Sequence, residues 1–208
     1  MMPPSQAPSL PRSQARLHPG WLRPLMLALP LLVFGHGVEA APRVVDSGAS
    51  QISFSVKQMG VAVDGRFTRY SASIDLDTEH PEQSKARIEV DISSLDTGTP
   101  EADAIAIDTP WLNANAFPKA VFESTAVRSL GPNRYQAEGQ LTIRGSTRAI
   151  SVPFTTTALP DGRLRAQGEF TLNRTDFGIG GGEWNQGDLV ADAVPVRFNL
   201  VLSPAPSP

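Results

Sequence analysis

Few side chains in this 208-residue sequence could do covalent or metal chemistry. There is no cysteine, which excludes disulfides, thiolate catalysis, cysteine-bound zinc and a lipidated N-terminal cysteine. Of three histidines, only His80 lies beyond the first forty residues, beside Pro81 in a stretch typical of a solvated turn. A Ser-His-Asp triad or a histidine-rich zinc site therefore lacks its parts. The sequence predicts no catalytic residue, no metal site and no cofactor.

The remaining charged groups favour structural roles. Asp75 and Asp77 stand two residues apart, and the alternation around them predicts that both lie solvated on an outer face. Arg174, in the segment NRTD, is expected to hold a turn by bonding to a carboxylate, because arginine has no usable base form. The formal net charge of −3 argues against nucleic-acid binding, which needs a basic stripe.

The first forty residues have the pattern of a secretory signal peptide. Three arginines precede an apolar run at residues 25–34, which is too short to span a bilayer. Val38 and Ala40 then place small residues at positions −3 and −1 of a cleavage point before Ala41. We therefore expect a signal peptide over residues 1–40 and a periplasmic mature protein.

Beyond residue 41, apolar and polar residues alternate with a period of two, which predicts half-buried strands. Turn-forming residues separate these runs, at residues 64–65, 131–133, 144–146 and 160–162. One helical insertion is expected over residues 99–115, with Pro100 in its first turn. About eight strands without crossover helices predict an all-β fold, an eight-stranded antiparallel, elongated lipocalin-like barrel over residues 41–203. Residues 204–208 read as a disordered, proline-rich tail. The alternating runs cover residues 52–57, 72–77, 85–92, 134–143, 150–154, 163–172 and 194–202.

The apolar phase of each run predicts which side chains point into the barrel and would contact an apolar ligand. An eight-stranded barrel is just wide enough to be filled by side chains or to hold one ligand, and the pattern alone leaves both open. Trp111, at the end of the helical insertion, would either cap the barrel or contact the ligand at its mouth. The predicted inward set is Phe54, Val56, Phe67, Ile88, Val90, Phe122, Leu141, Phe154, Phe170 and Phe198.

Several segments of this sequence resemble the YceI-like family of lipid-binding β-barrels. The most specific are GQLTIRGSTR at residues 139–148 and NRTDFG at residues 173–178. Residues 45–67, 94–98 with Asp103, and 117–124 match the family's opening strands, its entry to the helix and its next strand. The resemblance extends from about residue 43 to residue 202.

This resemblance implies a periplasmic barrel that holds a long apolar molecule, with polyisoprenoids as the type ligand, and no enzyme activity. The family often has histidine at two positions where this chain has Ala49 and Gln58, so ligand contacts through those histidines are absent here. The expected partners are a long-chain isoprenoid lipid or isoprenoid quinone and, transiently, a membrane. No nucleic-acid partner is expected, and the protein is expected to be a monomer or small homo-oligomer.

Two alternatives remain from the sequence. An outer-membrane barrel would use the same alternation with its apolar face outward. The mature chain has only two tryptophans and two tyrosines for the two girdles of such a barrel, namely Trp111, Trp184, Tyr70 and Tyr135. An enzyme that uses the cavity is the less favoured alternative, since it would depend on carboxylates alone.

Overall fold

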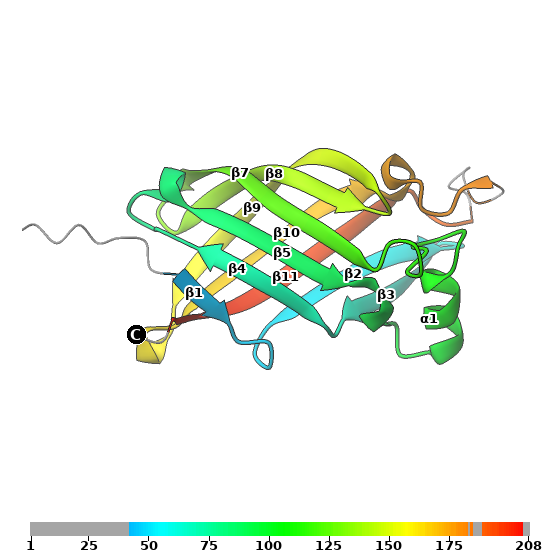
Figure 1. The fold of residues 1–208 in the computed structure, drawn as a ribbon, viewed down its shortest axis with the longest axis horizontal. Helices are drawn as coiled ribbons and strands as arrows, with labels where there is room; N and C mark the ends of the chain where they lie inside the picture. Colours follow the sequence, from blue (N-terminus) through cyan, green and yellow to red (C-terminus); the bar gives the residue numbers. More distant parts are fainter. Residues whose placement is uncertain (1–41, 183, 185–188, 206–208) are drawn as a thin grey trace, which may run out of the picture. The chain divides into compact units, whose positions relative to one another are not determined.

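The computed structural model describes residues 42–182, 184 and 189–205, so the predicted signal peptide lies outside the described residues. Strands dominate, and one α-helix lies beside one end of the barrel (Figure 1). The elements are β1 (Pro42–Val45), β2 (Gln51–Gln58), β3 (Val61–Phe67), β4 (Tyr70–Asp75), η1 (Pro81–Gln83), β5 (Lys85–Asp91), η2 (Ile92–Ser94), β6 (Leu95–Asp96), α1 (Pro100–Ile107), β7 (Lys119–Gly131), β8 (Arg134–Ile143), β9 (Ser146–Ala158), η3 (Pro160–Gly162), β10 (Leu164–Asn173), η4 (Arg174–Phe177) and β11 (Ala193–Pro204).

The strands form one antiparallel sheet that closes on itself. Within the described residues, eleven strands occupy eight positions around the barrel, because three positions are each shared by two short strands. β1 and β2 both pair with β11, while β4 and β3 pair with β1 and β2 on the other side. β5 and β6 then pair with β4 and β3. The predicted eight-stranded antiparallel barrel is confirmed.

The join between β1 and β2 lets both strands share β11. Asp46 donates its N–H to the carbonyl of Val201 at 2.9 Å, and the Ser50 hydroxyl accepts the N–H of Val201 at 2.8 Å. Residues 46–50 therefore loop outward while the sheet stays hydrogen-bonded on both sides of them. Closure leaves β11 without an exposed edge along these pairings, which removes a site for edge-to-edge aggregation. β11 runs through Pro204, one residue into the predicted tail, and residues 206–208 lie outside the described residues.

Three of the four predicted turns are confirmed, at residues 131–133, 144–146 and 160–162. The prediction of a turn at residues 64–65 is wrong, because Asp64 and Gly65 lie inside β3. The chain instead reverses at Met59 and Gly60, whose φ values of 47° and 81° both lie in the left-handed region. The β2–β3 ladder then runs without a break, so the Asp-Gly pair was a misleading turn signal.

The helix is shorter than predicted. Residues 99–115 were expected to be helical, but α1 ends at Ile107, and Asp108 has extended backbone angles. Pro110 prevents the helix from continuing further, because it disfavours the helical conformation of Thr109 and has no N–H to donate to the carbonyl of Ala106. Turns then carry the chain from residue 108 to β7. Among the described residues, no helix has the length and apolar character needed to cross a bilayer.

Three glycines on the inner face of the barrel each lie beneath a phenylalanine ring. A Cβ atom at Gly65 would lie 2.3 Å from Cζ of Phe54, its partner across the β2–β3 ladder. Only glycine permits so close an approach, so the ring lies against the wall of the barrel. The space along the axis is thereby kept free. The three pairs are Gly65 with Phe54, Gly139 with Phe122, and Gly168 with Phe198.

We expect Gly65→Ala to destabilise the fold by about 1–2 kcal/mol, because the added methyl must push the Phe54 ring away from the wall. Chemical denaturation measures this loss as a lower midpoint. Gly181→Ala is the matched control, since a Cβ there meets nothing within 4 Å. Adding Phe54→Leu to Gly65→Ala should recover part of the loss. Equal midpoints for the two glycine variants would contradict the packing role.

Candidate functional site

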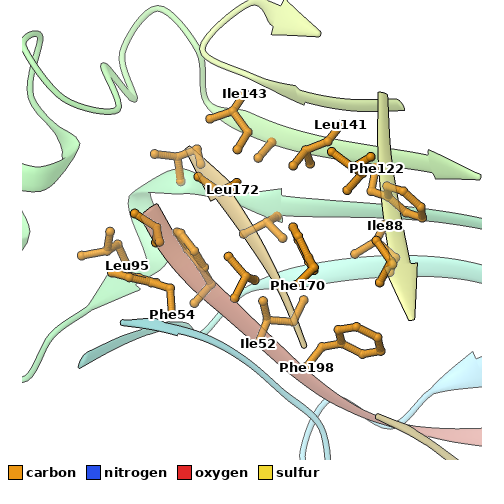
Figure 2. Close-up of a pocket in the computed structure, with 18 of the residues that line it drawn as sticks. Ile52, Phe54, Ile88, Leu95, Phe122, Leu141, Ile143, Phe170, Leu172 and Phe198 are labelled. Atoms are coloured by element: carbon orange, nitrogen blue, oxygen red, sulfur yellow. The ribbon is translucent and has the colours of Figure 1, made fainter. Parts of the chain in front are cut away.

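The barrel encloses an apolar cavity of about 410 Å³. This volume lies within the range of about 300–1,000 Å³ that is usual for small-molecule sites. Side chains from strands on different sides of the barrel converge on this space, as Figure 2 shows for Phe54, Ile88, Leu141 and Phe170. The open-lumen alternative is therefore the one that the structure supports.

Cross-strand pairing explains why the apolar residues converge. Residues directly opposite each other in a ladder point to the same face. Ile88 pairs with Phe122 and Phe122 pairs with Leu141, so one layer of hydrocarbon crosses β5, β7 and β8. Phe54 and Phe67 add a ring contact at 5.6 Å between centroids. The register of the strands therefore places these apolar side chains on the cavity wall, and no polar group is needed to position them.

The structure places every residue of the predicted binding set on the cavity wall. The members come from strands all around the barrel, and Trp111 reaches the cavity from the segment that follows α1. Their contact with a ligand stays a prediction. The set is Phe54, Val56, Phe67, Ile88, Val90, Phe122, Leu141, Phe154, Phe170, Phe198 and Trp111.

Sequence reasoning missed several lining residues. Ala102, Ile105 and Ala106 of α1 line the cavity, and their i, i+3, i+4 spacing is the pattern of one helix face, which could have identified them. Ile179 and Val190 also line it, from the segments that flank the barrel at the same end. No periodicity marks these two residues, so the sequence offered no comparable signal for them.

Polar lining residues lie at the two ends of the cavity. The mouth end, defined here by the β2–β3 turn, α1, η4 and the described residues after η4, contributes Gln58, Thr97 and Arg174. The far end, where β4 ends and β5 begins, contributes Asp75, Ser84 and Lys85. The wall between them is almost entirely hydrocarbon, so the cavity suits an apolar chain along its length.

Arg174 is the most unusual group at the mouth end, because it is only 2% exposed and its guanidinium bonds to backbone carbonyls. Nε donates to Ala191 at 3.2 Å, and Nη1 donates to Ile179 at 2.8 Å and Gly180 at 3.0 Å. Nη2 donates to Val190 at 2.9 Å and also to the carbonyl of Trp184. All five guanidinium donors are therefore used.

This arrangement corrects the prediction that Arg174 bonds to a carboxylate. Among the described residues, its recorded hydrogen bonds go only to carbonyl oxygens. Asp176 accepts from the Asn173 amide instead, at 3.4 Å. Trp111 covers the guanidinium, with 5.7 Å from the Arg174 Cζ to its ring. Carbonyl dipoles and an aromatic face thus stabilise the cation, and the hydrogen bonds tie residues 179–180, 184 and 190–191 to η4.

The prediction that Asp75 and Asp77 both lie solvated on an outer face is wrong. Asp75 is half-buried and lines the cavity. Asp77 is buried, and its Oδ1 accepts the N–H groups of Glu79 and His80, each at 2.8 Å. The hydrogen bond from His80, followed by that from Glu79, holds the pKa of Asp77 below its usual range. Asp77 therefore organises the loop before β5 rather than facing water. Within the described ranges, no three His, Asp or Glu side chains gather closely enough to hold a metal ion.

We expect Arg174→Met to destabilise the protein by about 2–5 kcal/mol, because buried carbonyls lose a charged donor. Denaturation midpoints give the total loss, and hydrogen exchange should localise it to residues 174–182 and 189–191. Arg197→Met is the control. It removes an exposed ion pair to Glu169 and should cost less than about 1 kcal/mol. If both substitutions lowered the midpoint equally, the carbonyl network would have no special role.

Comparisons with known proteins agree with this geometry. The sequence model of the YceI-like domain matches residues 44–202. A UPF0312 protein of Pseudomonas savastanoi pv. phaseolicola is 33% identical over 168 residues, covering 77% of this chain and 87% of that protein. A UPF0312 protein of Shewanella oneidensis is 33% identical over 150 residues, covering 68% and 78%.

Solved structures show the same barrel. Burkholderia cenocepacia BcnA is 32% identical, with a TM-score of 0.74 over 76% of this chain and 99% of that chain. A polyisoprenoid binding domain from Saccharophagus degradans, implicated in plant cell wall breakdown, is 18% identical, with a TM-score of 0.61 over 79% of this chain and 99% of that chain. At that identity the second match shows the fold alone. From the domain match, the relatives and the closed barrel together, the chain belongs to the YceI-like family.

Proposed function

We propose that this chain is a periplasmic, non-enzymatic binding protein that holds a long apolar isoprenoid lipid, either a polyprenyl chain or an isoprenoid quinone, for transport, storage or sequestration. The single observation that carries the proposal is the hydrocarbon-lined cavity along the barrel axis. The description of the Saccharophagus degradans domain as polyisoprenoid binding supports the ligand class.

The cavity has the length that a chain-like ligand needs. Its lining runs from Gln58 and Ile105 at the mouth end to Lys85 at the far end. β8 and β10 each have ten residues and span about 33 Å, which the usual tilt of barrel strands, about 35–45°, shortens to about 25 Å along the axis. A linear prenyl chain could lie along this axis with most of its surface buried, whereas a compact ligand would leave part of the wall uncovered.

The outer wall favours a water-exposed barrel over a membrane-spanning one. Arg87 bonds to Glu89 and Glu123 on this wall, and Lys119 bonds to Glu89 at 2.5 Å. Arg197 and Glu169 form a further exposed pair on β10 and β11. A barrel in lipid needs the reverse arrangement, with apolar residues outward and polar residues inward.

Recognition of the ligand is expected to depend on its chain more than on its head group. Arg174 lines the mouth end, but its five donors already bond to carbonyls, so it has none left for a phosphate. Ala49 and Gln58 replace the two histidines that the family often has. Affinity should therefore come chiefly from buried hydrocarbon, at about 25 cal/mol per Å².

We expect affinity to rise with chain length in a prenyl series that has a constant head group. Each buried CH₂ contributes up to about 0.8 kcal/mol, until the chain fills the cavity. Calorimetry or fluorescence titration with the purified protein gives the dissociation constants. Affinities that stay constant with length but change strongly with the head group would overturn the proposed mode of binding.

We expect Phe170→Asp to abolish lipid retention or to destabilise the fold by at least about 3 kcal/mol, because it puts a carboxylate on the apolar wall. Thr171→Asp is the matched control, since Thr171 is the next residue of β10 and is exposed. It should change neither property. Native mass spectrometry measures retention of the ligand. Loss of ligand from the Thr171 variant alone would show that Thr171, and not Phe170, faces the interior of the barrel.

A further inference from the structure

The most exposed large apolar side chains of the described residues gather at the mouth end. Met59 is 70% exposed, Val61 67% and Ile105 61%. Trp184 and Leu189 are also exposed. We call these five residues the mouth patch. Two other large apolar side chains, Val44 and Leu130, are exposed singly elsewhere on the barrel. Exposed hydrocarbon gathered at one end of a protein is typical of an interaction site.

Hydrogen bonds and ring contacts hold the separate segments of the mouth patch at one end of the barrel. The N–H of Met59 donates to the carbonyl of Leu189 at 2.7 Å, and Gln58 pairs with Val190. The ring of Trp184 lies 5.7 Å from that of Trp111, which follows α1. In Figure 1 the β2–β3 hairpin and α1 both lie at the right-hand end of the barrel.

The backbone at Met59 gives an independent indication that its side chain has a role. Met59 and Gly60 both have positive φ, as in the type I′ turns that favour Asn-Gly or Asp-Gly. A large apolar residue in the left-handed region is uncommon, and here it is also exposed to water. The turn requires the positive φ, but it does not require a large apolar side chain at this position. A strained position that also exposes hydrocarbon points to contact with another apolar surface.

The mouth patch is continuous with the cavity. Ile105 belongs to both, since it is exposed and also lines the cavity. Gln58 and Val63, which flank Met59 and Val61 in the hairpin, line the cavity as well. The far end differs in that an acidic and a basic side chain, Asp75 and Lys85, are among its lining residues. At the mouth end, Ile105 connects the cavity wall with exposed hydrocarbon, beside the polar lining residues Gln58 and Thr97.

We propose that the mouth patch inserts into the surface of a lipid bilayer and that ligand passes directly between the bilayer and the cavity. This inference rests on the proposed lipid-binding function. A prenyl chain that crossed water would expose all its hydrocarbon. A barrel with its mouth in the bilayer interface would keep the chain in apolar surroundings throughout the transfer. Met, Val, Ile, Leu and Trp side chains on hairpin and helix tips suit the interfacial region.

The charges beside the patch indicate insertion by hydrophobic contact. Lys57 is exposed next to the hairpin tip, and Glu101 is exposed in the first turn of α1. Both signs therefore occur, and the described residues beside the patch form no basic cluster to attract anionic lipids. Binding should therefore occur on phosphatidylcholine vesicles, change little when phosphatidylglycerol is added, and depend weakly on salt.

The test is vesicle co-flotation of the double variant Met59→Asp, Val61→Asp. Neither residue lines the cavity, and aspartate tolerates the positive φ of position 59, so fold and lipid binding should be retained. We expect a vesicle partition coefficient lower by about tenfold or more, since two inserted side chains become charged. All forms are expressed from the full chain and compared in the same processed state, checked by N-terminal sequencing.

Val44→Asp is the matched control, because Val44 is 52% exposed on β1, away from the mouth end. It should leave vesicle binding unchanged. If it reduced binding as much as the double variant does, the mouth patch would not be the docking surface. If the wild-type chain did not bind vesicles, the inference would be wrong. If the double variant changed the oligomeric state but not vesicle binding, the mouth patch would contact a second copy of the chain, and the inference would again be wrong.

Transfer kinetics separate this inference from the proposed function. With a fluorescent prenyl probe, docking predicts a transfer rate that increases with the concentration of acceptor vesicles, and a rate that falls at least several-fold in the double variant. A rate independent of vesicle concentration would overturn the inference while leaving lipid binding intact. Vesicle binding without any uptake of the prenyl probe would instead overturn the proposed function.

Discussion

Closure of the sheet by β11 is the interaction on which the rest of the structure depends. β11 is hydrogen-bonded to β10 on one side and to both β1 and β2 on the other. Side chains along each strand point alternately to the two faces of the sheet. When the sheet closes, one of these faces becomes the inside of the barrel and the other the outside. The hydrocarbon face turns inward and forms the cavity wall, while ion pairs such as Arg197–Glu169 remain on the outside in water.

For the cavity to stay open, the inward side chains of the closed barrel must not fill its interior. Small residues on the inner face, such as Ala86, Ala137 and Ala166, leave room along the axis. The glycine–phenylalanine pairs do the same for larger side chains, because each ring lies over a position without a Cβ. The wall can therefore be closely packed while the space along the axis stays free. The cavity follows from which residues lie on the inner face.

The mouth end uses a different principle, in which backbone carbonyls replace side-chain partners. A buried cation normally needs a carboxylate, and a carboxylate would bring a second charge into the site. The carbonyl groups around Arg174 and the face of Trp111 stabilise the guanidinium without one. The described residues after η4 that supply these carbonyls are thereby held beside the opening, while the lining remains largely apolar.

The sequence by itself determined the barrel and its inner face, because a period-two pattern depends only on neighbouring residues and fixes which side chains share a side. It also located three turns, where glycine or asparagine supplies positive φ. It misplaced the β2–β3 turn, since an Asp-Gly pair inside a ladder looks the same in sequence as one in a turn. Only the tertiary structure decided that the lumen is open, that Asp77 is buried, that Arg174 bonds to carbonyls, and that Met59 and Ile105 lie at one end. These features depend on contacts between residues that are distant in sequence. Every residue has a main-chain carbonyl, so the residue types do not show which carbonyls will bond to Arg174.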